Sequence, residues 1–252
     1  MNAIYSRFVE LLLSSRYAVA LTGAGLSVES GIPDFRSDEG VWAKYDPFEY
    51  GHIDSFRADP AKVWKLLEEM RALVESAGPN EAHYALGELE RVGVLKAIIT
   101  QNVDSLHQKG GASNVIEFHG SFRAMHCESC RKSYWSSEVS MAKLPPRCAC
   151  GGPIRPDVVL FGEGIPESVY LRAFEAASRC DLMIVAGTSA SVAPASDLPL
   201  VAKRGGASIV EINPNASDLP PELSDLRIIQ TAGEAFTNIM KVFNSMHTEV
   251  KN

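Results

Sequence analysis

Four cysteines have the spacing of a metal site. Cys127 and Cys130 form one pair, and Cys148 and Cys150 form a second pair after seventeen intervening residues. Two pairs at about this separation are typical of a zinc site in which four thiolates surround one ion. The second pair has only one residue between its cysteines, and the two glycines that follow it supply the flexible turn that so tight a pair needs. We therefore predict one structural Zn²⁺ held by these four residues.

A disulfide and a redox site are the alternatives for these cysteines. Five cysteines in 252 residues do not describe a secreted disulfide scaffold, and disulfides are rare in the cytoplasm. A redox Cys-x-x-Cys motif opens a helix after a strand, whereas the polar and aromatic residues around Cys127 indicate a hairpin. Cys180, the fifth cysteine, is expected to be a buried core thiol.

The segment LTGAGLSVESGIPDFR, residues 21–36, could bind a pyrophosphate. A strand that runs into Gly-x-Gly and a short helix lets the backbone approach phosphates, and the start of the helix offers amide hydrogens. Val28 stands where the dinucleotide-binding pattern has its third glycine or an alanine, and the acidic residue expected after a second strand is missing. A glycine turn that binds no ligand is therefore an equally good interpretation of these residues alone.

Polar side chains follow the other predicted strands. A single strand that ends in polar residues does not indicate a function, because asparagine and aspartate stabilise turns and serine and threonine cap helices. Because the carboxyl ends of parallel strands meet at one edge of a sheet, several polar ends together indicate a nucleotide-binding crevice. A histidine at that edge is a natural general base, since it titrates near neutral pH. The side chains concerned are Gln101, Asn102 and Asp104, then His119, then Thr188 and Ser189 after Gly187, and finally Asn213.

The elements that must hold these residues alternate between strand and helix. Apolar runs predict strands, and apolar residues at helical spacing predict helices. The alternation favours an α/β fold, with a Rossmann-like parallel sheet and helices on both of its faces. The predicted strands cover residues 17–22, 94–100, 114–118, 181–187 and 207–213, and the predicted helices begin near residues 1, 59, 80, 167, 192 and 233.

Two segments interrupt this alternation. Residues 36–75 carry only helical signals, and residues 120–156 hold the four cysteines. We predict that these two insertions together form a small domain, with a helical part and a zinc module. The Rossmann-like domain then consists of residues 1–35, 76–119 and 157–252.

The composition is that of an ordinary globular protein. The chain has 252 residues, of which 46% are hydrophobic, and a formal net charge of −7. A negative charge argues against direct nucleic-acid binding and suits a basic partner, such as a lysine-bearing peptide. No apolar run reaches the roughly 18 residues of a membrane span, and Arg7 and Glu10 interrupt what would be a signal-peptide core. We expect a cytoplasmic protein with no membrane partner.

In combination, the motifs resemble those of one family, the sirtuins, which are NAD-dependent protein deacylases. The resemblance extends from about residue 17 to residue 234, and the motifs follow one another in the family's order. They are GAGLSVESGIPDFR (23–36), TQNVDSLH (100–107), FHGS (118–121), the four cysteines, RPDVVLFGE (155–163), GTS (187–189) and EINP (211–214). This combination is far more specific than any one of its motifs.

The resemblance implies NAD⁺ as co-substrate and a role for each matching residue. It assigns Gly23, Ala24, Gly25 and Arg36 to the phosphates, Phe35 to the nicotinamide ribose, and Gln101, Asn102, Val103 and Asp104 to the ribose and the carboxamide. It assigns Gly187, Thr188, Ser189 and Asn213 to the adenosine half. Val28 and Ala232 are two further expected contacts of the cofactor. His119 would be the general base, with Asn102 as a second catalytic residue. The acyl-lysine cleft, in which a peptide adds as a strand, would be lined by Val159, Leu160, Phe161, Gly162 and Glu163.

The implied reaction removes an acyl group from a protein lysine. The acyl oxygen attacks the ribose carbon that bears nicotinamide, and nicotinamide leaves. His119 then takes a proton from a ribose hydroxyl, which attacks the resulting imidate, and water completes the transfer of the acyl group and releases the lysine. The products are nicotinamide, O-acyl-ADP-ribose and free lysine, and the zinc holds the small domain together. The expected substrates are acyl-lysine proteins or peptides, with a basic DNA-binding protein as one candidate class.

The acyl group is expected to be acetyl or a longer neutral chain. Sirtuins that prefer acidic acyl groups carry a tyrosine and an arginine three residues apart in the helical insertion, where this chain has Leu67 and Met70. Arg71 is one position off and would face another side of a helix. Two other functions stay open at this point, an ADP-ribosyltransferase on the same fold and a nicotinamide dehydrogenase or NAD-sensing module.

Overall fold

The main sheet of the computed structural model has six strands, each parallel to its neighbours. Their order, β3-β2-β1-β7-β8-β9, is that of a Rossmann sheet, because the chain fills one side of β1 before it crosses to the other. The switch point therefore lies between β1 and β7. The structure describes residues 2–215 and 217–250. The strands are β1 (Ala18–Thr22), β2 (Leu95–Thr100), β3 (Val115–Glu117), β7 (Leu182–Ala186), β8 (Ser208–Ile212) and β9 (Leu226–Ile228).

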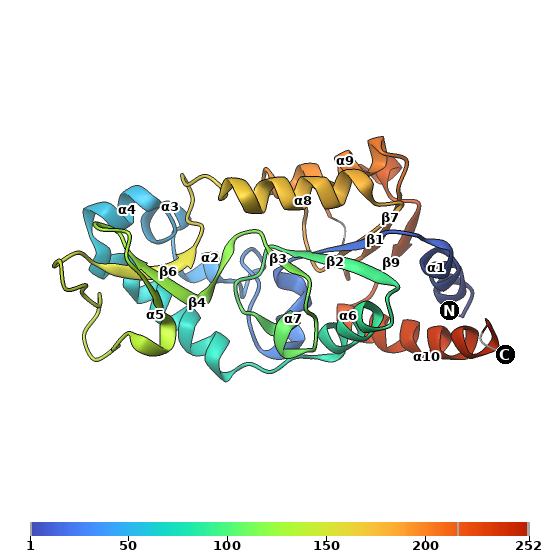
Figure 1. Ribbon diagram of the computed structural model, residues 1–252, viewed down its shortest axis with the longest axis horizontal. Coiled ribbons are helices and arrows are strands. Elements are labelled where there is room, and N and C mark those ends of the chain that lie inside the picture. The colour runs from blue at the N-terminus through green and yellow to red at the C-terminus, as the bar shows by residue number, and fades with distance from the viewer. Residues whose placement is uncertain (1, 216, 251–252) are drawn as a thin grey trace.

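Helices cover both faces of this sheet (Figure 1), which confirms the predicted fold class. Successive strand residues point to opposite faces, so Ala20 and Ile184 belong to one apolar core while Leu21 and Val185 belong to the other. One face carries α1 (Asn2–Ser14), α6 (Glu81–Arg91) and α10 (Ala232–Val250), and the other carries α8 (Glu167–Arg179) and α9 (Leu198–Arg204).

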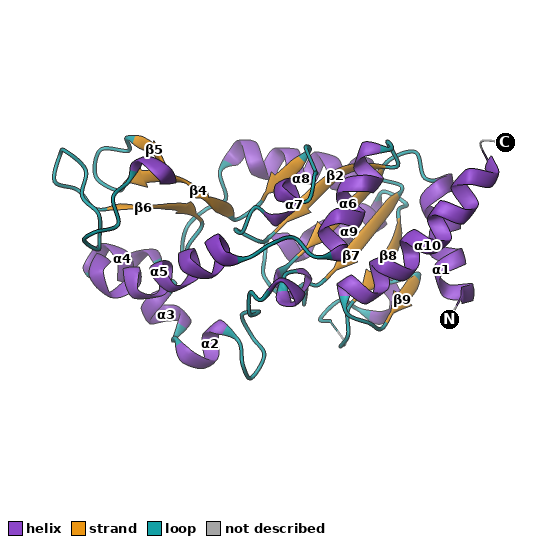
Figure 2. Ribbon diagram, turned by 90° about the horizontal axis from the view of Figure 1, so that it is seen from below, coloured by secondary structure: helices purple, strands orange, loops and turns teal. Residues whose placement is uncertain are grey.

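A smaller third core lies at the end of the molecule opposite α1 and α10 (Figure 2). Helices pack there against an antiparallel sheet of order β5-β4-β6. Trp64 is fully buried between them, and its indole N–H donates to the Ile154 carbonyl at 2.9 Å. β6 extends past residue 156, the predicted end of the second insertion. The elements are α2 (Val41–Lys44), α3 (Pro47–Tyr50), α4 (Ile53–Ala58), α5 (Pro60–Ser76), β4 (Gly120–Cys127), β5 (Ser133–Trp135) and β6 (Ile154–Val158).

Short helices form several of the connections. None of the helices in the described part of the chain has the length and apolar character needed to cross a bilayer. The short elements are α7 (Leu106–Lys109) and the 3-10 helices η1 (Ala24–Leu26), η2 (Val28–Ser30), η3 (Ser136–Glu138), η4 (Ala195–Asp197) and η5 (Pro221–Leu223).

Most predicted elements are present, and the exceptions have local causes. The Asp59 side chain accepts a hydrogen bond from the Lys62 N–H, which confirms the predicted start of α5. The helix predicted from residue 192 begins only at Leu198, because Pro199 has no N–H and fits only the first turn of a helix. β9 was not predicted, since its three residues include only one that is buried, Ile228.

Candidate active site

Two glycine-containing turns meet at the switch point of the sheet. The Gly25 N–H donates to the Gly187 carbonyl at 2.8 Å, so the turn after β1 touches the turn after β7 through the backbone. Gly187 has a φ of +61°, and a Cβ at this position would lie 2.2 Å from the Leu26 nitrogen. Only glycine readily adopts a positive φ and also lacks the Cβ that would clash with the Leu26 nitrogen. The two motifs, far apart in sequence, therefore form one crevice.

A cavity of about 440 Å³ extends from this crevice to the small domain. Its walls include glycines, amide and hydroxyl side chains, one histidine and an apolar segment. It thereby brings together most of the residues that the motifs predicted. These are Gly23, Ala24, Gly25, Phe35, Arg36, Gln101, Asn102, Val103, His119, Val159, Leu160, Phe161, Gly162, Glu163, Gly187, Thr188, Ser189 and Asn213.

Three predicted contact residues lie outside the lining of the cavity. Asp104 is 4% exposed and accepts hydrogen bonds from the Ser27 hydroxyl at 2.7 Å and the Leu106 N–H at 2.8 Å. Burial raises the pKa of its carboxyl, although these two donors favour the charged form. Val28 is 47% exposed, and Ala232 is buried at the start of α10.

Several lining residues were not predicted from the sequence. Asp34 and Pro214 stand inside quoted motifs, so their motifs could have identified them. Trp42 and Phe122 had no comparable signal, because each belongs to an insertion that reaches the cavity only in the folded chain. The other unpredicted lining residues are Gly51, Leu66, Val158, Ile165, Val192, Ala193, Pro194, Asn215 and Ser217.

Amide side chains tie the strand ends together around the crevice. Asn102 is 6% exposed, and its Nδ2 donates to the Gly23 carbonyl at 3.0 Å. Gln101 Nε2 donates to Thr188 Oγ1 at 2.8 Å across the switch point. Asn213 Nδ2 donates to the Thr188 carbonyl at 3.1 Å. The turns after β1, β2, β7 and β8 are thus cross-linked by hydrogen bonds before any ligand binds.

His119 is held as a neutral imidazole with one nitrogen free. Burial lowers its pKa, and the hydrogen bond to the Gln101 carbonyl opposes that shift. The Nδ1 atom lies 3.2 Å from this carbonyl oxygen, and because a carbonyl can only accept, Nδ1 carries the proton. Nε2 then has its lone pair available. A neutral histidine of this tautomer at a cavity wall can act as a general base near neutral pH.

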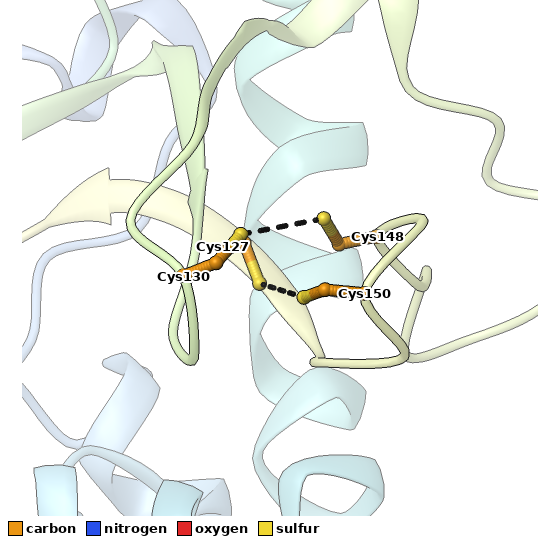
Figure 3. Close-up of side chains that lie close together, drawn as sticks. All are labelled: Cys127, Cys130, Cys148 and Cys150. Carbon is orange, nitrogen blue, oxygen red and sulfur yellow. Dashed lines mark hydrogen bonds between the residues drawn. The ribbon is translucent and has the colours of Figure 1, made fainter.

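The four predicted zinc ligands converge at the end of β4 (Figure 3). Their sulfur atoms all lie within 4.8 Å of one another, with 3.5 Å between Cys127 and Cys150 and 3.6 Å between Cys130 and Cys148. Four thiolates at a Zn–S distance of about 2.3 Å are about 3.8 Å apart, so this cluster fits one tetrahedral zinc ion. We find no comparable group of metal-ligating side chains elsewhere in the described residues.

The glycines after the second pair close the turn that the single intervening alanine requires. The Gly151 N–H donates to the Cys148 carbonyl at 2.8 Å, and the Cys148 N–H donates to the Gly152 carbonyl at 2.9 Å. Gly151 has a φ of +86°, and a Cβ at Gly152 would lie 2.7 Å from the Cys127 sulfur. Two glycines are therefore needed to bring this pair to the cluster.

The surroundings of the cluster favour a thiolate at Cys148, whereas a backbone hydrogen bond from Gly152 is outweighed at Cys150 by the neighbouring cysteines, which raise its pKa to about 12. The Cys150 backbone N–H and the Tyr134 hydroxyl, which is 3.1 Å from the Cys148 sulfur, lower the pKa of Cys148 to about 6. His126 is no part of the cluster, because its ring contacts Asp157 instead. Cys180 is buried in the core beneath α8, as predicted.

A family model identifies the chain. The model of the Sir2 family matches residues 23–194, which is more than half of the sequence. The chain belongs to the Sir2 family.

Similar proteins support this assignment over more than nine tenths of the chain. A Sir2 relative from Archaeoglobus fulgidus, named NAD-dependent protein deacylase 1, is 47% identical over 239 residues, covering 93% of this chain and 96% of its own. A solved Sir2 homologue variant in complex with ADP-ribose has a TM-score of 0.92 and 44% identity, with 96% and 97% coverage. A Sir2 variant with a deacetylated peptide and 3′-O-acetyl ADP-ribose has a TM-score of 0.89 and 37% identity, with 93% and 96% coverage.

In this Sir2 chain, the cavity wall contributed by α5 is apolar. Leu66, Leu67 and Met70 line the cavity from that helix. Arg71 lies elsewhere, since its guanidinium contacts Glu68 and Glu75 of the same helix. Among the described residues, α5 therefore contributes no cation to the lining of the cavity.

Proposed function

We propose that this Sir2 protein is an NAD-dependent protein lysine deacylase that yields nicotinamide, O-acyl-ADP-ribose and free lysine. The observation that carries this conclusion is a single cavity that joins the glycine crevice, the neutral His119 and the apolar segment around Phe161. NAD⁺ is the co-substrate, and when bound it supplies an electrophilic ribose carbon with nicotinamide as its leaving group. The residues of the chain bind and orient the two substrates and accept the proton that the reaction releases.

The nucleotide is proposed to lie along the strand ends. Gly23, Gly25 and Gly187 let the turns after β1 and β7 pack against each other, because a Cβ at any of them would clash and their N–H groups donate to backbone carbonyls. The pyrophosphate is proposed to lie over these packed turns. Arg36, whose Nη1 is 3.5 Å from Ser189 Oγ, would place its charge beside the phosphates. Gln101 and Asn102 would hold the ribose and the carboxamide in position, Asn213 would contact the adenosine half, and Phe35 would shield the reacting end from water.

His119 is proposed to act as the general base. Its Nε2 is unprotonated at neutral pH because burial disfavours the imidazolium form. The Gln101 carbonyl orients the ring through Nδ1. Nε2 can then accept the proton of a ribose hydroxyl that enters the cavity. This transfer makes the hydroxyl oxygen nucleophilic toward the acyl carbon of the bound lysine.

The acyl-lysine is proposed to enter between the two domains, beside the segment that ends β6. The Val159 N–H donates to the His119 carbonyl at 2.9 Å, so this segment lies directly next to the base. Leu67 and Met70 give the acyl end an apolar wall, which favours acetyl or longer neutral chains. A succinyl carboxylate would be buried there without a cation, which is unfavourable.

The zinc is proposed to be structural. Cys127, Cys130, Cys148 and Cys150 would hold the ion and cross-link the loops of the small sheet. All four lie outside the lining of the cavity, so the ion supplies folding energy and no chemistry.

The partner class and the compartment are further proposals. The net charge of −7 suits basic acyl-lysine proteins, among them a basic DNA-binding protein, and disfavours direct contact with nucleic acid. In the described part of the chain, no disulfide joins any of the five cysteines, which suits a cytoplasmic location.

Incubation with NAD⁺ and an acetyl-lysine peptide tests the proposed function. We expect deacetylated peptide and nicotinamide in equal amounts, and a His119→Ala variant that binds NAD⁺ without turning over. A His247→Ala variant, altered on α10 away from the cavity, serves as the matched control and should turn over normally. ADP-ribose attached to protein without any deacylation would show an ADP-ribosyltransferase instead, and full turnover by His119→Ala would refute the assigned base.

A further inference from the structure

Arg155 is a buried cation that connects three parts of the small domain. It is only 2% exposed, although a guanidinium is costly to remove from water unless acceptors surround it. Its Nε donates to Glu128 at 3.1 Å, its Nη1 donates to the Val158 carbonyl at 3.0 Å, and its Nη2 donates to Glu163. Each edge of the guanidinium therefore has its own acceptor, and two carboxylates balance its charge.

The Glu163 partner closes a turn that faces the cavity. Its carboxylate accepts the Leu160 N–H at 3.0 Å, and its own N–H donates to the Leu160 carbonyl at 3.1 Å. Gly162 in this turn has a φ of +83°, and a Cβ there would lie 2.6 Å from His52 Nε2. The Phe161 backbone pairs with the helical insertion, since its N–H donates to the carbonyl of residue 51 at 2.9 Å. Residues 160–163, which line the cavity, are thus fixed in one shape.

The Glu128 partner lies on the turn that carries the first cysteine pair of the cluster. It stands between Cys127 and Cys130, and its side chain is 14% exposed. It also accepts a hydrogen bond from Arg57 Nε of α4 at 3.1 Å, and its backbone N–H donates to the Pro153 carbonyl at 2.9 Å. The orientation of Glu128 therefore depends on the turn that carries the first cysteine pair.

We infer that Arg155 is a positioning residue that holds the turn of residues 160–163 in its peptide-binding shape by anchoring it to the cysteine cluster at Glu128. The inference rests on the proposed function of that turn as part of the acyl-lysine cleft. Arg155 does not line the cavity, so it acts through Glu163 and Val158 rather than on the substrate. It also provides a physical route by which loss of the metal would weaken peptide binding without contact between metal and peptide.

Two conservative variants test this role in the full chain. Arg155→Lys keeps the charge, but the three N–H donors of an ammonium radiate from one nitrogen and cannot reach three acceptors that are spread around a planar guanidinium. Glu163→Gln keeps one oxygen that can accept from Leu160 or from Arg155, but not both in the original geometry. Arg71→Lys is the matched control, because Arg71 also bridges two glutamates but lies outside the cavity lining.

The dissociation constants of an acetyl-lysine peptide and of NAD⁺ are measured separately by titration, after zinc content and circular dichroism show that each variant is folded. For Arg155→Lys we expect the peptide Kd to rise about tenfold or more, as befits a lost charge-assisted hydrogen bond. The NAD⁺ Kd and kcat at saturating peptide should stay unchanged. Glu163→Gln should show a smaller rise in peptide Kd, and Arg71→Lys none.

Unchanged peptide affinity in folded Arg155→Lys and Glu163→Gln overturns the inference. A parallel loss of peptide and NAD⁺ affinity overturns it as well, because that result indicates a general structural role. If Arg155→Lys does not fold, Glu128→Gln decides instead, since it alters a carboxylate partner of Arg155 that lies outside the cavity lining and leaves Glu163 unchanged. A wild-type chain that neither binds nor deacylates the peptide refutes the proposed function instead.

Discussion

Two buried histidines beneath the crevice should make this protein lose stability in mild acid. His83 and His107 are 0% and 1% exposed, and their rings pack edge to face with centroids 5.0 Å apart. His83 Nδ1 accepts the Asn80 N–H at 3.2 Å, and His107 Nε2 lies 2.9 Å from Thr22 Oγ1. Burial lowers the pKa of His83 to about 4 and the pKa of His107 well below its ordinary value.

The sign of the effect follows from proton binding. In the unfolded chain His83 has its ordinary pKa of 6.5, whereas in the folded chain the value is about 4. Between these values the unfolded chain binds more protons, so the stabilisation is complete above pH 6.5 and is lost as the pH falls toward 4. For His83 alone, the free energy of unfolding should drop by about 2 kcal/mol between about pH 7.5 and pH 5. His107 acts in the same direction.

Urea unfolding of the wild type and of His83→Gln at about pH 7.5 and about pH 5 isolates the contribution of His83 to the free energy of unfolding. Glutamine cannot titrate, and at the third position of α6 it can still accept the Asn80 N–H as the histidine does. We expect the stability of the variant to fall by about 2 kcal/mol less than that of the wild type. Leu86→Met, a neutral change in the same helix, should shift stability equally at both pH values. An equal fall for His83→Gln and the wild type would refute the assignment of a neutral buried histidine.

Three further outcomes are expected. Removal of zinc with a chelator should unfold the small domain and abolish deacylation; a metal-free chain whose circular dichroism and activity are unchanged would contradict the structural role. Gly187→Ala should weaken NAD⁺ binding and lower the melting temperature, because a Cβ there would lie 2.2 Å from a backbone nitrogen, whereas Gly78→Ala, with open space around it, should leave both unchanged. Leu67→Tyr combined with Met70→Arg should raise kcat/KM for a succinyl-lysine peptide relative to an acetyl-lysine peptide, since a cation would then face the acyl end; an unchanged ratio would show that these positions do not select the acyl group.

The main sheet was predictable because its strands are buried on both faces. Such strands are continuous apolar runs, which the sequence displays without reference to distant residues. α8 begins at the predicted residue, since Glu167 opens an amphipathic segment that runs to Arg179. The four cysteines were equally easy to predict as a metal site, because each pair is held by its own local turn. The glycines after Cys150 mark the tighter of the two turns.

The finer features of the site were harder to predict from the sequence, because they depend on contacts between distant segments. Asp104 belongs to a polar motif, yet the structure buries it beneath the cavity, where Ser27 satisfies it from another strand end. Phe122 and Trp42 reach the cavity only after the insertions fold back on the main domain. No pattern of spacing contains that information.

The sequence by itself determined most of the strand and helix alternation of the main domain, the glycines at the turns and the residue types for a nucleotide, a base and a metal. These depend on local properties, namely burial period, backbone freedom and ligand chemistry. Only the tertiary structure decided which of these residues share a cavity, that His119 is neutral, and that Arg155 joins the cysteine cluster to residues 160–163. The physical reason is that desolvation and charge pairing act through space, between groups that only the folded chain brings together.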